Sequence, residues 1–253
     1  MPNGRCSTTE GLWVGNDGNW STFSFDNGTP PQQVQSLPAI SLSGIYPVLA
    51  QGCSNLPPDC AVSRSGVFDS DESPSTSNFS SATALQLVQE LPDYAVNASV
   101  REDTFSLAGT TLQSQTIAGF TSTTPWLGLL GLGVTACQFA GFSSSSLPYN
   151  GSAIASMVNG QDAASFWGYT AGRSYIHGPH PPVLGSLTIG GYDGNRYNMS
   201  NDVVASFSSG APGQYTVALD TFTLWIANDT SLYGPPVESS SGDVVIDSTV
   251  PDL

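Results

Sequence analysis

The residue best suited to do chemistry in this 253-residue chain is Asp247, which lies between apolar and hydroxyl side chains in residues 245–249 (VIDST). A carboxylate in such a turn can act as a general acid or base in hydrolysis. No second segment of the sequence repeats this pattern around an aspartate. The structural alternative is that Asp247 only caps a turn, because aspartate often accepts hydrogen bonds from nearby backbone N–H groups.

Other groups of residues that could form a catalytic or metal site have weaker support in the sequence. Residues 177–182 (HGPHPP) contain both histidines, but no cysteine or acidic residue lies close by in sequence, and zinc sites need three or four ligands. We interpret this segment as a proline-rich surface loop. The chain has no Gly-x-Ser-x-Gly turn, which argues against a serine hydrolase. Residues 69–72 (DSDE) resemble the start of a calcium loop but lack its later glycine and glutamate, so we expect no metal and no cofactor.

The charge balance is strongly acidic. Twenty Asp and Glu residues stand against five arginines and no lysine, which gives a net charge of −15. Scattered arginines cannot displace the counterions of a nucleic acid, so we expect no nucleic-acid partner. The missing lysine excludes a P-loop and Schiff-base chemistry. Because self-repulsion falls as carboxylates are protonated, the composition favours an acidic extracellular or vacuolar setting.

Seven Asn-x-Ser/Thr sequons favour a secreted glycoprotein, although Pro30 weakens the second. They begin at Asn19, Asn27, Asn78, Asn97, Asn150, Asn198 and Asn228.

The four cysteines allow three pairings. Cys53 and Cys60 enclose a short Pro-Pro-Asp loop that a disulfide could staple, and Cys6 would then pair with Cys137 by elimination. No apolar run is long enough to span a membrane. Residues 1–6 lack the apolar core of a signal peptide, so we expect a leader to be missing from the N-terminus.

The elements that must position these residues are mostly strands. Short alternating or β-branched runs recur between turn residues and predict an all-β protein with short helices at residues 82–91 and 153–158. Residues 126–133 and 185–193 combine glycine with large apolar side chains, which predicts close backbone approach inside a packed sheet. The expected strands are residues 20–25, 34–37, 104–107, 116–120, 186–189, 215–219, 221–226 and 244–246.

Four segments, taken in order, resemble the landmark sequence of the pepsin-like aspartic proteases. They are residues 27–32 (NGTPPQ), 128–132 (GLLGL), 185–193 (GSLTIGGYD) and 245–249 (VIDST). The match runs from about Trp13 to the last residue. Residues 167–172 (WGYTAG) and the sequon density resemble the fungal secreted members.

The resemblance implies a bilobal pepsin-like fold, with residues 1–190 forming the N-terminal lobe and residues 191–253 beginning the C-terminal lobe. It also implies a cleft between the lobes, to which each lobe contributes one aspartate. Two close carboxylates share one proton, so the charged one activates water while the protonated one polarises the peptide carbonyl. Since the chain stops soon after Asp247, we expect an incomplete C-terminal lobe and a piece of a longer product.

The first aspartate of this pair is absent. Counting ten residues from Thr29, as the family does, leads to Ala39, and no acidic residue occurs between Asn27 and Asp59. Thr249 stands where the family has glycine, which would disturb the turn. We therefore interpret Asp247 as a relic of the fold, with Ala39 replacing its partner.

The resemblance assigns substrate contacts to Tyr94, Ser248 and Thr249. Tyr94, ahead of Asp103, is the candidate tyrosine of the flap that covers substrate, or alternatively a core residue. A glycan on Asn97 would crowd the cleft mouth.

We expect a secreted monomer that has lost peptidase activity and binds a peptide or protein ligand between its lobes. The alternative is an active aspartic endopeptidase working at acidic pH, which would require an aspartate to reach Asp247 from elsewhere.

Overall fold

The structure, a computed structural model, is mostly β, and this confirms the predicted all-β class. It describes residues 7–15, 20–86, 95–133, 151–159, 166–173 and 183–196, together with the short pieces 216–219, 222–224, 237–239, 242–246 and 248. The main sheet contains β2 (Leu12–Val14), β3 (Trp20–Asn27), β4 (Gln32–Ala39), β5 (Ile45–Tyr46), β6 (Ser77–Gln86), β7 (Ala95–Leu107), β8 (Thr110–Phe120) and β9 (Gly128–Gly131).

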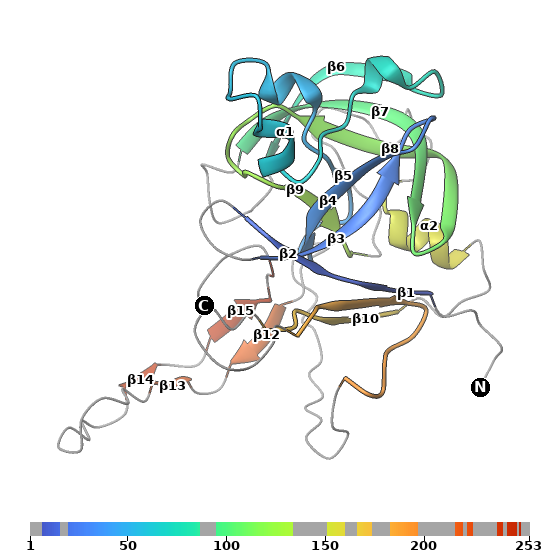
Figure 1. Cartoon of the computed structure of the whole chain (residues 1–253). Helices are drawn as coiled ribbons and strands as arrows, with labels where there is room; N and C mark the ends of the chain where they lie inside the picture. The colour runs from blue at the N-terminus through green and yellow to red at the C-terminus, as the bar shows by residue number, and fades with distance from the viewer. Residues whose placement is uncertain are drawn as a thin grey trace.

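The main sheet has the order β2-β3-β4-β9-β5-β8-β7-β6, and an added pairing of β3 with β7 makes it curl back on itself (Figure 1). At one edge β2 has only three residues. At the other edge β6 pairs with β7 through two register irregularities, between Asn78 and Ser80 and between Ser80 and Thr83.

Strand β9 separates β4 from β5, although these two strands follow one another in sequence. It runs parallel to β4, with Ser36 opposite Gly128 and Ala39 opposite Gly131, and antiparallel to β5. The glycines of β9 permit this insertion, because a Cβ at Gly131 would lie 2.5 Å from the Gly44 carbonyl oxygen. The predicted close approach at residues 126–133 is confirmed here.

Two apolar clusters lie against the main sheet. The first contains Phe23, Phe25, Phe105, Leu130 and one face of α2 (Ala153–Asn159). The second contains Leu37, Ala39, Tyr46, Val48, Phe120 and Leu129. The helix predicted at residues 153–158 is therefore present, and its apolar face is buried.

The helix predicted at residues 82–91 is wrong for the part that the structure describes. Residues 82–86 belong to β6 and pair with β7, where Leu85 lies opposite Val96. Their Ala, Leu and Gln content favours a helix locally, but pairing with a long neighbouring strand overrides that propensity. Residues 87–91 lie outside the described part.

A three-stranded sheet with the order β1-β11-β10 lies beside the main sheet. It is formed by β1 (Ser7–Glu10), β10 (Trp167–Thr170) and β11 (Ser186–Ile189). Leu187 and Ile189 join the first apolar cluster, and Tyr169 packs edge-on against Phe23 at a centroid distance of 6.0 Å. The chain's first described strand is thereby tied to residues far along the sequence.

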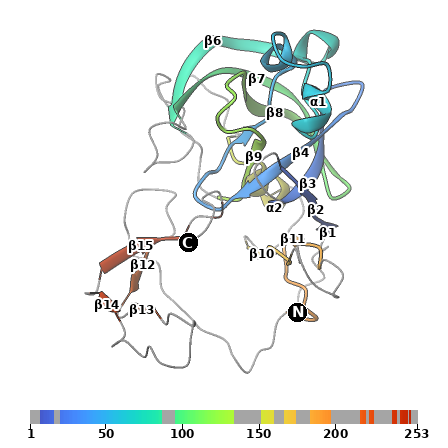
Figure 2. The ribbon, with the colours of Figure 1, turned by 60° about the vertical axis from the view of Figure 1, so that its left-hand side comes forward.

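The described strands after residue 190 pair only with one another. They are β12 (Thr216–Leu219), β13 (Phe222–Leu224), β14 (Val237–Ser239) and β15 (Gly242–Val245), and they form two small antiparallel sheets, β12-β15 and β13-β14. Figure 2 shows them beside the C-terminus and apart from the main sheet. The division between two lobes at residue 190 stays a prediction.

The contact between β3 and the β11 sheet depends on two glycines. Gly11 and Gly185 lie on Ser21, and Gly11 N donates to the Gly185 carbonyl oxygen at 2.8 Å. A Cβ at Gly185 would overlap Ser21 Oγ and approach the Thr170 carbonyl oxygen at 3.0 Å. The close approach predicted for residues 185–193 is thus confirmed at Gly185.

Gly185→Ala is expected to lower the free energy of unfolding by about 1–3 kcal/mol, because the added methyl forces the two sheets apart. The matched control is Gly194→Ala, where a Cβ meets no atom within 4 Å. Denaturant unfolding of both variants measures the difference. Equal midpoints for the two variants would contradict this account of the sheet contact.

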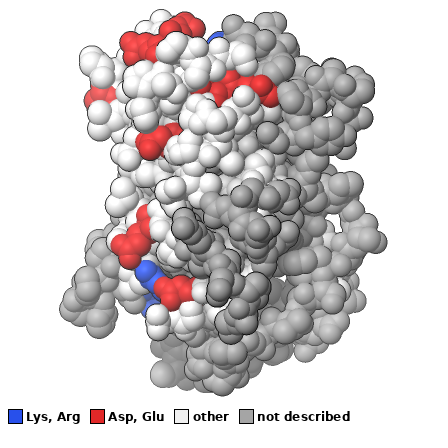
Figure 3. Space-filling model, turned by 90° about the vertical axis from the view of Figure 1, so that its right-hand side faces the viewer, with Lys and Arg blue, Asp and Glu red and all other residues white. Residues whose placement is uncertain are grey.

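Acidic side chains form several separate patches on the face shown in Figure 3, where basic atoms are rare. Glu102 of β7 lies opposite Thr116 of β8, and burial raises the pKa of its carboxyl above the ordinary value. A raised pKa means that the folded state binds the proton more tightly than the unfolded state does. The resulting stabilisation is present below the ordinary pKa and is lost as the pH rises through the raised value.

Glu102→Gln is expected to remove this loss, so the variant gains stability over wild type at pH 7 and not at pH 3. Denaturant unfolding at both pH values measures the gain. Glu72→Gln, which changes an exposed carboxylate, serves as the control. The same pH dependence in both variants would show that Glu102 has no special role.

Candidate functional site

Ala39 ends β4 and is completely buried. Its methyl lies in the second apolar cluster with Leu37 and Leu129, and its carbonyl oxygen accepts the Leu132 N–H at 2.9 Å. Residues 36–46 contain no acidic side chain, so this part of the strand and its turn offer no carboxylate. The position expected for the first aspartate holds an apolar group in a packed environment.

The turn after Ala39 is fixed by main-chain hydrogen bonds to residues at the end of β9. Gly131 N donates to the Gly44 carbonyl oxygen at 2.8 Å, and Gly133 N donates to the Leu42 carbonyl oxygen at 2.8 Å. A Cβ at Gly133 would lie 3.0 Å from that same Leu42 oxygen. Close backbone contact therefore holds the turn in place from one side.

Ser248 holds the turn from a distant part of the chain. Its Oγ accepts the Ile40 N–H at 3.1 Å and donates to the Pro38 carbonyl oxygen. These two groups lie on either side of Ala39, 208 and 210 residues from Ser248 in sequence. The structure thus brings the residue after Asp247 directly onto the turn of Ala39.

Several predicted site residues lie outside the described part of the chain. They are Asp247, Thr249 and Tyr94. Tyr94 directly precedes β7, whose pairing with β6 is described from Ala95 opposite Gln86 onward. The structure therefore brings together Ala39 and Ser248 among the predicted site residues, and the roles of the other three stay predictions.

The carboxyl group of Asp103 has a structural role, because it accepts hydrogen bonds from neighbouring parts of the chain. It is almost fully buried in β7 and accepts hydrogen bonds from Ser75 Oγ at 2.6 Å, from Thr76 Oγ1 and from Thr104 N at 2.7 Å. Hydroxyl and amide donors satisfy this carboxyl group, and they fix the segment before β6 against β7. Asp69 likewise accepts the Asp71 N–H at 3.0 Å, which caps the acidic turn at Ser70–Glu72.

The predicted glycosylation sites differ in exposure. Asn97 is exposed on β7, as a glycan requires. Asn27 is completely buried, and its amide nitrogen is among the buried atoms without a hydrogen-bond partner, so the folded chain has no room for a glycan there and that prediction is wrong. The remaining sequons have side chains outside the described residues: Asn19, Asn78, Asn150, Asn198 and Asn228.

The predicted disulfide between Cys53 and Cys60 is confirmed. It closes the loop between the 3-10 turn Ala50–Cys53 and α1 (Cys60–Ser63). Cys6 and Cys137 lie outside the described residues, so their pairing stays a prediction.

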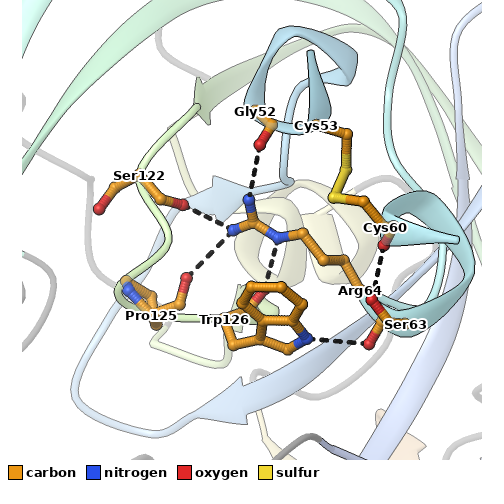
Figure 4. The surroundings of a disulfide bond; sticks show 8 residues. All are labelled: Gly52, Cys53, Cys60, Ser63, Arg64, Ser122, Pro125 and Trp126. Carbon is orange, nitrogen blue, oxygen red and sulfur yellow. Dashed lines mark hydrogen bonds between the residues drawn. A yellow bond between two sulfur atoms is a disulfide. The ribbon is translucent and has the colours of Figure 1, made fainter. Parts of the chain in front are cut away.

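Arg64 is a buried residue that sequence reasoning missed. It follows α1, is completely buried, and donates to the carbonyl oxygens of Gly52, Ser122, Pro125 and Trp126 (Figure 4). We call Arg64 and these four carbonyl groups the Arg64 hub. One arginine among five scattered ones carries no sequence signal of burial, so only the fold reveals it.

Comparisons with known proteins add no family. Neither a scan against protein-family models nor a search of curated proteins found a match for this chain. Among the residues that the structure describes, no helix is long and apolar enough to cross a membrane. In the same residues, no group of three or more His, Cys, Asp and Glu side chains could hold a metal ion.

Ser248→Ala is expected to lower the free energy of unfolding by about 1–3 kcal/mol, because the Pro38 carbonyl and the Ile40 N–H lose their shared partner. Ser248→Thr, which keeps the hydroxyl, is the matched control. Thermal unfolding measures the stability, and amide exchange at residues 38–43 shows where the loss is felt. Unchanged exchange in that turn would contradict the role given to Ser248.

Proposed function

We propose that the chain is a secreted member of the pepsin-like aspartic protease family that has no peptidase activity and acts by binding a peptide or protein. The observation that carries the proposal is the contact of Ser248 with both main-chain groups that flank Ala39. In a two-carboxylate site, the turn after each aspartate must lie close to the other. Here Ser248, the residue after Asp247, contacts the main chain on either side of Ala39, whose side chain is only a methyl group.

The chemistry of peptide hydrolysis explains why this matters. One carboxylate must be ionised to activate water while its partner keeps a proton, and their closeness is what separates the two pKa values. With Ala39 at the position of the first aspartate, Asp247 alone can supply only one of these groups. Thr249, which stands where the family has glycine, is a further departure from a working pair.

The architecture supports the same proposal. The resemblance implies a β-rich N-terminal lobe, and the described strands up to residue 190 form such a body. Tyr94, the candidate flap tyrosine, directly precedes β7 in sequence, and β7 pairs with β6. An acidic surface and the exposed sequon at Asn97 fit a secreted protein that functions in acid.

The wild-type protein is expected to show no peptide hydrolysis between roughly pH 3 and 5, the range in which such dyads operate. Cleavage of a mixed peptide library, with and without a statine-type inhibitor, measures this, and Asp247→Asn is the matched variant. Inhibitor-sensitive cleavage that Asp247→Asn abolishes would establish the alternative, an active aspartic endopeptidase.

Binding is tested separately with a fluorescent library of extended peptides at the same pH. Peptides retained by wild type are expected to bind Asp247→Asn equally well, because the proposed binding does not use an ionised dyad. If no extended peptide is retained, the binding part of the proposal is wrong, while the loss of hydrolysis stands on its own measurement.

A further inference from the structure

Two links close the surface loop that runs from Gly52 to Arg64. The disulfide joins Cys53 to Cys60, and Arg64 Nη1 donates to the carbonyl oxygen of Gly52, the residue before Cys53. At 3.4 Å, this is the longest of the four hydrogen bonds of Arg64, the others being 2.6, 2.8 and 3.2 Å. Of the four contacts, the one to Gly52 is therefore the one that we expect to respond first when the disulfide no longer fixes the adjacent Cys53.

The same arginine ties this loop to the connection between β8 and β9. Arg64 Nε donates to the Trp126 carbonyl oxygen at 2.8 Å, while Trp126 Nε1 donates to the carbonyl oxygen of Ser63 at 2.9 Å. The guanidinium carbon also lies 5.1 Å from the centre of the Trp126 ring. Because of these reciprocal contacts, a displacement of Arg64 is expected to displace Trp126 as well (Figure 4).

The Arg64 hub is sensitive to the loss of any acceptor, because no carboxylate in the described part of the chain forms an ion pair with its guanidinium. Among the described residues, the structure gives the guanidinium only carbonyl acceptors and two aromatic faces. Burial lowers the pKa of Arg64 to about 10, so the group is still a cation at neutral and acidic pH. Removing one carbonyl acceptor from a buried guanidinium costs free energy. Two states are therefore favoured: one in which all four hydrogen bonds are made, and one in which water reaches the guanidinium.

The disulfide is placed where a reductant can reach it. Cys53 is partly exposed, Cys60 is buried, and the loop between them is exposed at Ser54, Asn55 and residues 57–59. A thiolate can therefore approach the bond from the Cys53 side. Residues 53–60 contain no basic side chain that would select an acidic protein as the reductant, so the reductant is named only as a dithiol.

We propose that the Cys53–Cys60 disulfide is a redox-sensitive lock on the Arg64 hub, and that its reduction by a dithiol loosens the β8–β9 connection. One reductant thiolate attacks Cys53 Sγ and forms a mixed disulfide, and Cys60 Sγ leaves and takes a proton from solvent. The second reductant thiol then releases Cys53 as a protonated thiol, and the dithiol becomes a disulfide. The proposal holds whichever function the chain performs.

The strand pairing predicts which residues respond when the disulfide is reduced. Trp126 lies two residues before β9, and β9 pairs with β4 from Ser36 to Ala39. Opening the hub removes the anchor at the start of β9, so residues 121–131 are expected to respond first. The β7 strand at Phe105–Leu107 has no contact with the hub among those given above and serves as the internal reference.

Peptide-resolved amide exchange tests the proposal in the variant Cys6→Ser with Cys137→Ser, in which a dithiol can act only on Cys53 and Cys60. Alkylation of the digest reports how many thiols are free. Reduction is expected to raise exchange at residues 121–131 several-fold and to leave residues 105–107 unchanged. If this variant does not fold, wild type treated in the same way gives the measurement, with all four cysteines read from the digest.

Arg64→Lys separates the hub from the disulfide alone, because lysine keeps the charge but cannot match four carbonyl groups in the plane of a guanidinium. Oxidised Arg64→Lys is expected to show raised exchange at residues 121–131 already, with little further change on reduction. Two free thiols in the parent without a change at residues 121–131 would overturn the proposal. A uniform rise of amide exchange over the whole chain on reduction would also overturn it. So would a rise at residues 121–131 on reduction that is as large in Arg64→Lys as in the parent.

Discussion

The insertion of β9 between β4 and β5 is the constraint on which the rest of the described structure depends. It requires glycine at the points where β9 meets its neighbours, because any side chain at Gly131 would strike the backbone at Gly44. Once inserted, β9 sends Leu129 into one apolar cluster and Leu130 into the other. The same strand fixes the turn after Ala39 and begins just beyond Trp126. Core, candidate site and Arg64 hub thus share one strand.

The sequence predicted the features that are set by local pattern. Alternation over residues 20–25 and 186–189 gave strands at the right places, and the short spacing of Cys53 and Cys60 indicated their disulfide. The failure at residues 82–86 has the opposite origin, since a helix-favouring composition was outweighed by pairing with a strand that follows later in the chain. Propensity is local, whereas strand pairing is decided by the whole sheet.

The candidate site was predictable only in part. Counting from Thr29 located Ala39, whose burial at the end of β4 the structure then describes. The two hydrogen bonds of Ser248 join segments more than 200 residues apart; the resemblance implies that these two turns approach each other, but no local pattern in either segment indicates the hydrogen bonds themselves. Arg64 was invisible for a related reason, because burial of an arginine depends on carbonyl groups that the fold assembles from separate loops.

The distribution of positive charge sharpens the acidic character of the surface. Arg64 is withdrawn from solvent, and Arg196 lies 3.6 Å from both Glu10 and Asp193. Arg64 therefore does little to offset the carboxylates that solvent meets, whereas Arg196 offsets part of the charge of Glu10 and Asp193. Any partner approaching at neutral pH experiences a more negative surface than the net charge alone suggests.

The two edge strands of the main sheet, β2 and β6, determine how readily copies of the chain can pair at acidic pH. As carboxylates take up protons, the repulsion that keeps copies of the chain apart weakens, and an exposed strand edge becomes a place where copies can join. The short β2 offers little length for such pairing, and the irregular register of β6 interrupts the row of groups that a second chain would need. Edge geometry thus limits strand pairing between copies of the chain where charge no longer does.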